Sequence, residues 1–134
     1  ITDVRLTGGT VRSPVIVRSF HEILKEAQRR YFKTFPYGTK PAQASGTFLG
    51  AIAAISSSAS TGIVNFSYPR MRATPTVVRY SPTQANTNWR STDDATQALS
   101  AIIHTGDTGA IITMSAADFA NTGYAIHATA DARF

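Results

Sequence analysis

The sequence predicts an all-β protein, an antiparallel β-sandwich or barrel with one short helix near the N-terminus. Two observations lead to this fold class. After residue 45, short runs of β-branched and aromatic residues alternate with turn residues, which is the pattern of successive strands. Before residue 30, one run instead has the spacing of an amphipathic helix. The 134 residues include no cysteine and are enough for one domain with its own core.

The chain is predicted to begin with a segment outside the domain. Residues 1–17 form an extended linker from an upstream region, since Pro14 disfavours helix at the residue before it. Residues 18–134 form the β-sandwich domain. Because the chain begins with Ile1 rather than Met, we expect it to be the C-terminal part of a longer protein.

One helix is predicted over residues 20–28. Ser19 lies three residues before Glu22, and in this capping-box pattern each side chain accepts a hydrogen bond from the other's backbone N–H. The apolar residues recur at helical spacing and form one stripe: Phe20, Ile23, Leu24 and Ala27. A helix of this length does not persist alone, so we expect the stripe to dock on another part of the protein.

The basic and aromatic run AQRRYFKTF, residues 27–35, allows two interpretations. Aromatic rings beside cations can hold single-stranded nucleic acid, but no nucleic-acid-binding motif accompanies them here. A change of period from 3.6 to two instead predicts a strand that leaves the helix, with Tyr31 and Phe35 on one face. Arg29 and Arg30 then stand at the negative end of the helix dipole, where cations are favoured.

The later strands are predicted at residues 47–55, 63–68, 76–80, 99–104, 110–114 and 124–130. Two of them, 99–104 and 110–114, are separated by turn residues and should form a hairpin. No run is long and apolar enough to cross a bilayer, so we expect no membrane insertion.

The net charge of +5 is unevenly distributed. Residues 1–80 hold 11 Lys and Arg against 3 Asp and Glu, a net charge of +8, whereas residues 81–134 hold 2 against 5, a net charge of −3. A basic half favours an anionic partner such as nucleic acid, lipopolysaccharide or an acidic glycan. Solvated strand faces or subunit contacts explain the same charges equally well.

The residue types that usually perform chemistry do not form a recognisable site. His21, His104 and His127 are scattered, with no cysteine or carboxylate at metal-ligand spacing. Asp93 and Asp94 are adjacent in a polar loop, and a glycosidase would need a partner carboxyl group across a cleft. The chain has neither a Gly-x-Ser-x-Gly elbow nor a glycine-rich phosphate loop. We therefore predict a non-catalytic protein without metal or cofactor.

One long polar loop, SPTQANTNWRSTDDATQ at residues 81–97, is the candidate ligand site. It holds the only tryptophan, Trp89, whose flat ring can stack on the apolar face of a sugar. The neighbouring polar side chains can bond sugar hydroxyls: Asn86, Asn88, Arg90, Asp93 and Asp94. The alternative is that the ring packs back on its own loop or into a neighbouring subunit.

Three segments carry a resemblance to a known family: SFHEILKEAQRRYFKTF at 19–35, YPRMRATPTVVRYSP at 68–82 and the closing ADARF. In this order they resemble a domain near the C-termini of tail-fibre and other virion structural proteins of tailed bacteriophages and prophages. The resemblance covers about residues 14–134. The family usually has a cysteine where Ala27 stands, and often ends in an acidic-aliphatic pair instead of Arg133-Phe134.

The resemblance implies a jelly-roll-type β-sandwich that assembles as a homotrimer at the end of a fibre or spike. It implies a virion protein of the tail, outside the cell, that contacts bacterial surface polysaccharide or other virion proteins. Two alternatives remain: a trimerisation or capping domain that binds no ligand, and an accessory domain of an upstream polysaccharide depolymerase. No catalytic residue carries over, and no nucleic-acid partner is expected.

Overall fold

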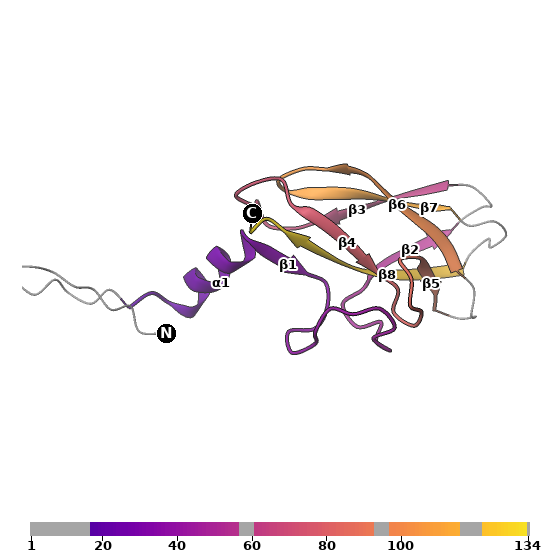
Figure 1. Cartoon of the computed structure of the whole chain (residues 1–134), viewed down its shortest axis with the longest axis horizontal. Coiled ribbons are helices and arrows are strands. Elements are labelled where there is room, and N and C mark those ends of the chain that lie inside the picture. The colour runs from indigo at the N-terminus through magenta and orange to yellow at the C-terminus, as the bar shows by residue number, and fades with distance from the viewer. Residues whose placement is uncertain (1–16, 57–60, 93–96, 116–121, 134) are drawn as a thin grey trace, which may run out of the picture.

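The computed structural model describes residues 17–56, 61–92, 97–115 and 122–133. Within them the protein is mostly β, with one short helix near the N-terminus, so this part of the predicted fold class is confirmed (Figure 1). The elements are α1 (Phe20–Gln28), β1 (Tyr31–Lys33), β2 (Ile52–Ser56), β3 (Thr61–Ser67), β4 (Thr76–Tyr80), β5 (Trp89–Ser91), β6 (Gln97–Thr105), β7 (Gly109–Ser115) and β8 (Thr122–Asp131).

The eight strands pair antiparallel in one strongly curled sheet that resembles half of a barrel. The main order is β1-β8-β5-β6-β7-β3, and β2 and β4 also pair with β8. Although β1 and β3 are the two ends of this order, the ring centroids of Phe32 and Phe66 lie only 6.0 Å apart. The curl therefore brings the two ends of the sheet together over a shared core.

Strand β8 is the centre of the sheet. Its residues Thr129 to Asp131 pair with both β1 and β4, and Tyr124 and Ala125 pair with both β2 and β5. Since one stretch can pair twice only through its two edges, β8 has neighbours on both edges along most of its length. It is accordingly almost fully buried, and small side chains fill the crowded positions: Ala125, Ala128 and Ala130.

The core lies inside the curl. It is built from the inward faces of β3, β7 and β8 together with β5, and its largest fully buried side chains include Trp89, Tyr124, Ile112 and Ile126. The alternation on β7 is regular, with Ala110, Ile112 and Met114 buried and their neighbours partly exposed. One face of this strand therefore belongs to the core and the other to the surface.

Helix α1 has the predicted boundaries because its signals are local. The Oγ of Ser19 accepts from the backbone N–H of Glu22 at 3.3 Å, and the Glu22 carboxylate accepts from the Ser19 N–H at 3.0 Å. Arg29 is the C-cap, and β1 begins two residues later. The predicted helix-to-strand junction is thus confirmed.

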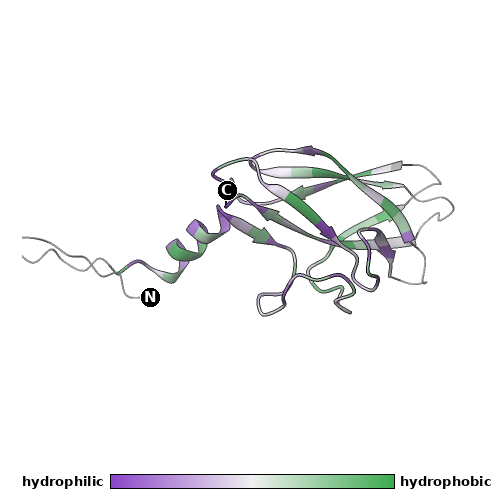
Figure 2. Cartoon of the chain, viewed as in Figure 1, coloured by the Kyte–Doolittle hydropathy of each residue, from purple (hydrophilic) through white to green (hydrophobic). Residues whose placement is uncertain are grey.

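The expected docking of the α1 stripe is wrong within the described part of the chain. None of the nine residues of α1 is buried, and Phe20 and Ile23 are 70% and 46% exposed. The helix points away from the curled sheet, and Figure 2 shows that hydrophobic and hydrophilic residues alternate along it. Most of the stripe is therefore exposed within the described part of the chain.

Two strand predictions need correction. The strand predicted at 47–55 begins only at Ile52, because the chain turns at Gly50, whose φ of 81° is a conformation that glycine adopts readily. A Cβ there would also collide with the carbonyl oxygen of Thr34. The second correction is β5, which lies inside the segment predicted to be a long loop. The 99–104 and 110–114 hairpin is confirmed as β6 and β7.

Candidate functional site

The tryptophan of the predicted glycan loop is a core residue. Trp89 opens β5, its side chain is 0% exposed, and its indole Nε1 donates to the carbonyl oxygen of Thr113 at 2.9 Å. A ring enclosed in this way offers no face to a sugar, so the stacking role predicted for Trp89 is wrong in this conformation. The ring lies in the core of the domain and bonds to β7, rather than packing on its own loop as the alternative interpretation had it.

The other residues of the predicted site do not converge on a ligand. The side-chain amides of Asn86 and Asn88 both donate to Oε1 of Gln97, at 2.7 and 3.3 Å, which ties the two ends of the loop together. Arg90 is half-buried and pairs with Ala125 of β8. Asp93 and Asp94 lie outside the described residues. Glycan binding by this loop remains a prediction, but the buried Trp89 does not supply an aromatic platform for it.

A groove forms instead across β1, β8 and β4, with a volume of about 390 Å³. The strand register explains its lining, because Tyr31 pairs with Asp131, and Asp131 pairs with Thr76 across the other edge of β8. Two residues further along β8, Thr129 pairs with Val78 on the same face of the sheet. The groove is lined by Tyr31, Lys40, Pro41, Thr76, Val78, Tyr80, Thr129, Asp131 and Arg133.

A charged pair fixes one side of this groove. Nε of Arg133 donates to both carboxylate oxygens of Asp131, at 2.9 and 3.0 Å. The guanidinium carbon also lies 5.2 Å from the ring centroid of Tyr31, within cation–π range. Hydrogen bonding to Arg133 holds the pKa of Asp131 below its usual value, and burial raises the pKa of Tyr31. At neutral pH the groove therefore presents a carboxylate, a guanidinium and a neutral phenol.

The rim of the groove is held by the turn after β1. Nζ of Lys33 donates to the carbonyl oxygens of Tyr37 and Thr39, at 2.9 and 2.6 Å. These two bonds fix the turn and thereby place the next residues, Lys40 and Pro41, at the groove. The groove is thus built from paired strands and a pinned turn.

Sequence reasoning missed this groove because its residues come from three distant segments. The local pattern was visible in the sequence: Tyr31 and Lys33 are two positions apart and share one face of an extended chain, and so do Asp131 and Arg133. What the sequence does not give is the register that places them beside one another. The strands β1 and β4 both pair with the end of β8, and all three meet here.

The buried side chain of His127 packs on Phe35, which in turn packs on Tyr80 of the groove. His127 is 0% exposed, its ring stacks on Phe35 at 4.0 Å, and Phe35 meets the Tyr80 ring edge-on at 5.5 Å. Nε2 of His127 lies 3.0 Å from the carbonyl oxygen of Thr47, which can only accept, so Nε2 carries a proton. Nδ1 lies 2.9 Å from the hydroxyl oxygen of Thr34, which also lies 3.3 Å from the carbonyl oxygen of Ala128. These contacts hold the segment between β1 and β2 against β8.

Acid should weaken the fold through His127. Burial lowers the pKa of His127 below its ordinary value of 6.5, although the Thr47 carbonyl opposes the shift. The unfolded chain therefore binds the proton first, so the stabilisation is complete above about pH 6.5 and falls as pH drops towards the folded-state pKa. Urea unfolding between pH 7 and pH 5 should show this loss.

The control for this pH dependence is a second histidine substitution. His127→Gln should reduce the loss of stability between pH 7 and pH 5, whereas His21→Gln, at an exposed helix position, should leave it unchanged. An identical pH dependence in all three proteins would mean that His127 is not the group that titrates.

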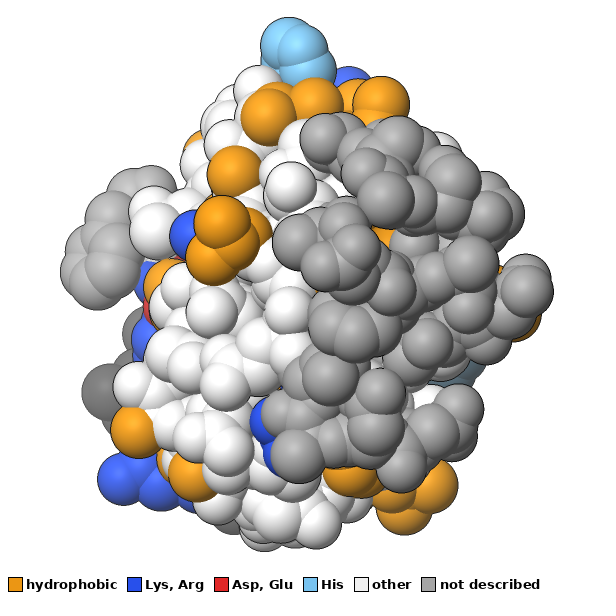
Figure 3. All heavy atoms as spheres, turned by 90° about the vertical axis from the view of Figure 1, so that its right-hand side faces the viewer, with side chains coloured by type: hydrophobic (Ala, Val, Ile, Leu, Met, Phe, Trp, Pro, Cys, Tyr) orange, Lys and Arg blue, Asp and Glu red, His pale blue; other side chains and the backbone are white. Residues whose placement is uncertain are grey.

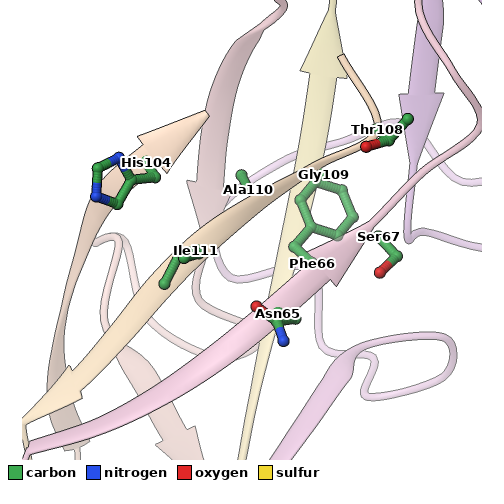
Figure 4. A pocket seen from close by; sticks show the side chains of 8 residues that line it. All are labelled: Asn65, Phe66, Ser67, His104, Thr108, Gly109, Ala110 and Ile111. Carbon is green, nitrogen blue, oxygen red and sulfur yellow. The ribbon is translucent and has the colours of Figure 1, made fainter. Parts of the chain in front are cut away.

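The outer face of β3, β7 and β6 has a different character. None of the three strands contains Lys, Arg, Asp or Glu, and Ile63 and Leu99 on this face are 67% and 65% exposed. A shallow pocket of about 350 Å³ crosses it, and Figure 4 shows His104, Ile111 and Asn65 on the three neighbouring strands. Figure 3 views a different side, the end of the molecule away from α1, where scattered apolar side chains and some Lys and Arg side chains lie among other surface atoms. The outer face of β3, β7 and β6 suits contact with protein better than contact with an ionic ligand.

Comparison with protein-family models, curated proteins and solved structures finds no significant match to this chain. Among the described residues, no three His, Asp or Glu side chains gather into a group that could hold a metal ion. In the same part of the chain, no helix has the length and apolar character needed to cross a membrane.

Proposed function

We propose that this chain is a non-catalytic domain of a virion tail fibre or spike, which assembles as a homotrimer and attaches to polysaccharide on the bacterial surface. The observation that carries the proposal is the projecting helix α1. Nine residues make a helix too short to persist in water without packing, yet in its apolar stripe Leu24 is only half-buried and the other three residues are exposed.

Further copies of the chain are the partners that fit this stripe. Phe20, Ile23 and Ala27 follow one another at spacings of three and four, which is the a/d spacing of a coiled-coil seam. Charged residues flank the seam and pair within one chain, as Arg18 before α1 and Arg30 after it both do with Glu26, at 2.7 and 3.7 Å. Three identical chains around one axis bury equivalent stripes against one another and close the assembly.

The finer fold assignment is part of the same proposal. In a jelly-roll-type sandwich, β3, β7 and β6 form one layer and β8 with its neighbours forms the other. The contact between Phe32 and Phe66 supports it, because it joins a strand of each layer.

A specific observation favours a second candidate, a structural trimerisation or capping domain without a ligand. The only tryptophan is buried, and the outer face of β3, β7 and β6 is uncharged and partly apolar. Such a face suits contact with another subunit or another virion protein. A third proposal is that the chain is an accessory domain of an upstream polysaccharide depolymerase.

Binding to bacteria separates attachment from the capping function. We expect the labelled trimer to bind cells of a host strain and to lose that binding on an isogenic strain without surface polysaccharide. Individual sites are weak, and three linked copies raise the apparent affinity by roughly 10²–10⁴ when they bind together. The measurement is flow cytometry across a strain panel, with heat-unfolded protein as the control. A stable trimer that binds none of the strains would favour the capping domain.

A further inference from the structure

We propose that the groove across β1, β8 and β4 binds a sugar unit that carries a carboxylate, as part of a bacterial surface polysaccharide. The inference rests on the proposed attachment function and replaces the 81–97 loop as its binding site. The volume of about 390 Å³ lies within the roughly 300–1,000 Å³ typical of small-ligand sites. It is enough for one or two sugar units.

Two tyrosines give the groove its affinity for a sugar ring. Tyr31 enters from β1 and Tyr80 from β4, so they flank β8 from its opposite edges. Both are partly exposed, and each is held by its neighbours, Tyr31 by Arg133 and Tyr80 by Phe35. A phenol offers an apolar face for the C–H groups of a sugar and a hydroxyl for its polar edge.

The hydroxyl group of Thr76 supplies hydrogen bonds in the sugar plane. Thr76 is exposed in the groove, and its side chain has no hydrogen-bond partner among the described residues. Its hydroxyl can therefore donate to and accept from a ligand. Thr129 also lines the groove but is only 3% exposed. Asp131 adds a carboxylate that is kept ionised by Arg133.

The charges of the groove favour an acidic sugar over a neutral one. Its charged lining is Lys40, Arg133 and Asp131, a net charge of +1. Arg133 bonds Asp131 through Nε and Nη2, and Lys40 forms no ion pair within the described part of the chain. Lys40 and Nη1 of Arg133 are thus available to a sugar carboxylate. The carboxylate of Asp131 in the same groove disfavours a phosphodiester chain, which would bring many negative charges.

The test is binding of the intact trimer to defined acidic oligosaccharides, followed by amide chemical-shift changes in NMR spectra. The probes are oligomers of a hexuronic acid, of a sialic acid and of a 3-deoxy-octulosonic acid, each beside its carboxyl-reduced form. We expect at least one acidic oligomer to shift the amides of Tyr31, Thr129 and Asp131. Its carboxyl-reduced form should bind roughly tenfold more weakly, because one charge-assisted contact is lost.

Matched variants separate a specific site from general attraction to a basic protein. Lys40→Gln and Arg70→Gln each remove one exposed cation, but only Lys40 lines the groove. We expect Lys40→Gln to weaken binding roughly tenfold and Arg70→Gln to leave it within about twofold. Tyr31→Ala should abolish the shifts, and its far-ultraviolet circular dichroism shows whether it is folded.

Three results would overturn the inference: no shift at the groove amides with any acidic probe, equal binding of the carboxyl-reduced probe, or equal weakening by Lys40→Gln and Arg70→Gln. The bacterial strain panel shows whether only the groove proposal fails or the proposed attachment function fails as well. If the wild type and Lys40→Gln bind cells equally, attachment stands and the groove is not its site. If the wild type binds neither cells nor any probe, both proposals fail.

Discussion

Trp89→Ala should lower the free energy of unfolding by about 3–5 kcal/mol, the usual cost of removing a large buried aromatic side chain. The ring is fully enclosed, and the substitution also removes its hydrogen bond to Thr113. A domain is typically stable by only about 5–15 kcal/mol, so much of the variant should be unfolded at modest urea concentrations. Urea titration followed by circular dichroism measures the difference.

The matched control is Tyr37→Ala, which truncates an aromatic residue that is largely exposed. Its stability should stay within about 0.5 kcal/mol of the wild type. In the wild type, the single tryptophan also reports its own burial, with blue-shifted fluorescence that iodide does not quench. Unchanged stability of Trp89→Ala together with strong iodide quenching would place the ring at the surface and revive the 81–97 loop as a glycan platform.

Ile23→Lys should convert the proposed homotrimer into monomers while leaving the curled sheet folded. The substitution places a cation in the middle of the stripe that we propose to be shared between chains, where three copies would meet like charges without solvent. In one isolated chain the side chain is half exposed and not in the core, so the sheet does not depend on it. Sedimentation equilibrium measures the mass, and the fluorescence of Trp89 measures the fold.

The control places the same cation elsewhere on the helix. His21 is exposed and lies outside the stripe, so His21→Lys should remain a trimer. If both variants dissociate, added charge anywhere on α1 is enough to break the assembly, and the stripe has no special role. If neither dissociates, the interface lies elsewhere, and the uncharged face of β3, β7 and β6 is the next surface to test.

The features that sequence could predict are those with local causes. The boundaries of α1 follow from the capping box at Ser19 and Glu22, and the β6–β7 hairpin follows from the turn residues between its strands. The spacing of the α1 stripe was also readable. The partner of the stripe was not, because nothing local to the helix shows whether the sheet of its own chain lies beside it.

The position of Trp89 illustrates the opposite case. Its neighbours are polar, which favours a surface loop, but β5 is only three residues long and alternates: Trp89 and Ser91 face inward and Arg90 is half-buried. So short a strand has no periodicity that a sequence window can detect. The groove was equally unreadable, because Tyr31 and Asp131 are 100 positions apart and meet only through the register of β1 on β8.

The mass of the wild-type protein in solution tests the central claim most directly, that copies of this chain assemble through α1. Sedimentation equilibrium at several concentrations should give about 43 kDa, three chains of 14.4 kDa, together with the fluorescence of a buried tryptophan. A folded protein that sediments at 14.4 kDa at every concentration would contradict it, since the stripe of α1 would then stay exposed in solution.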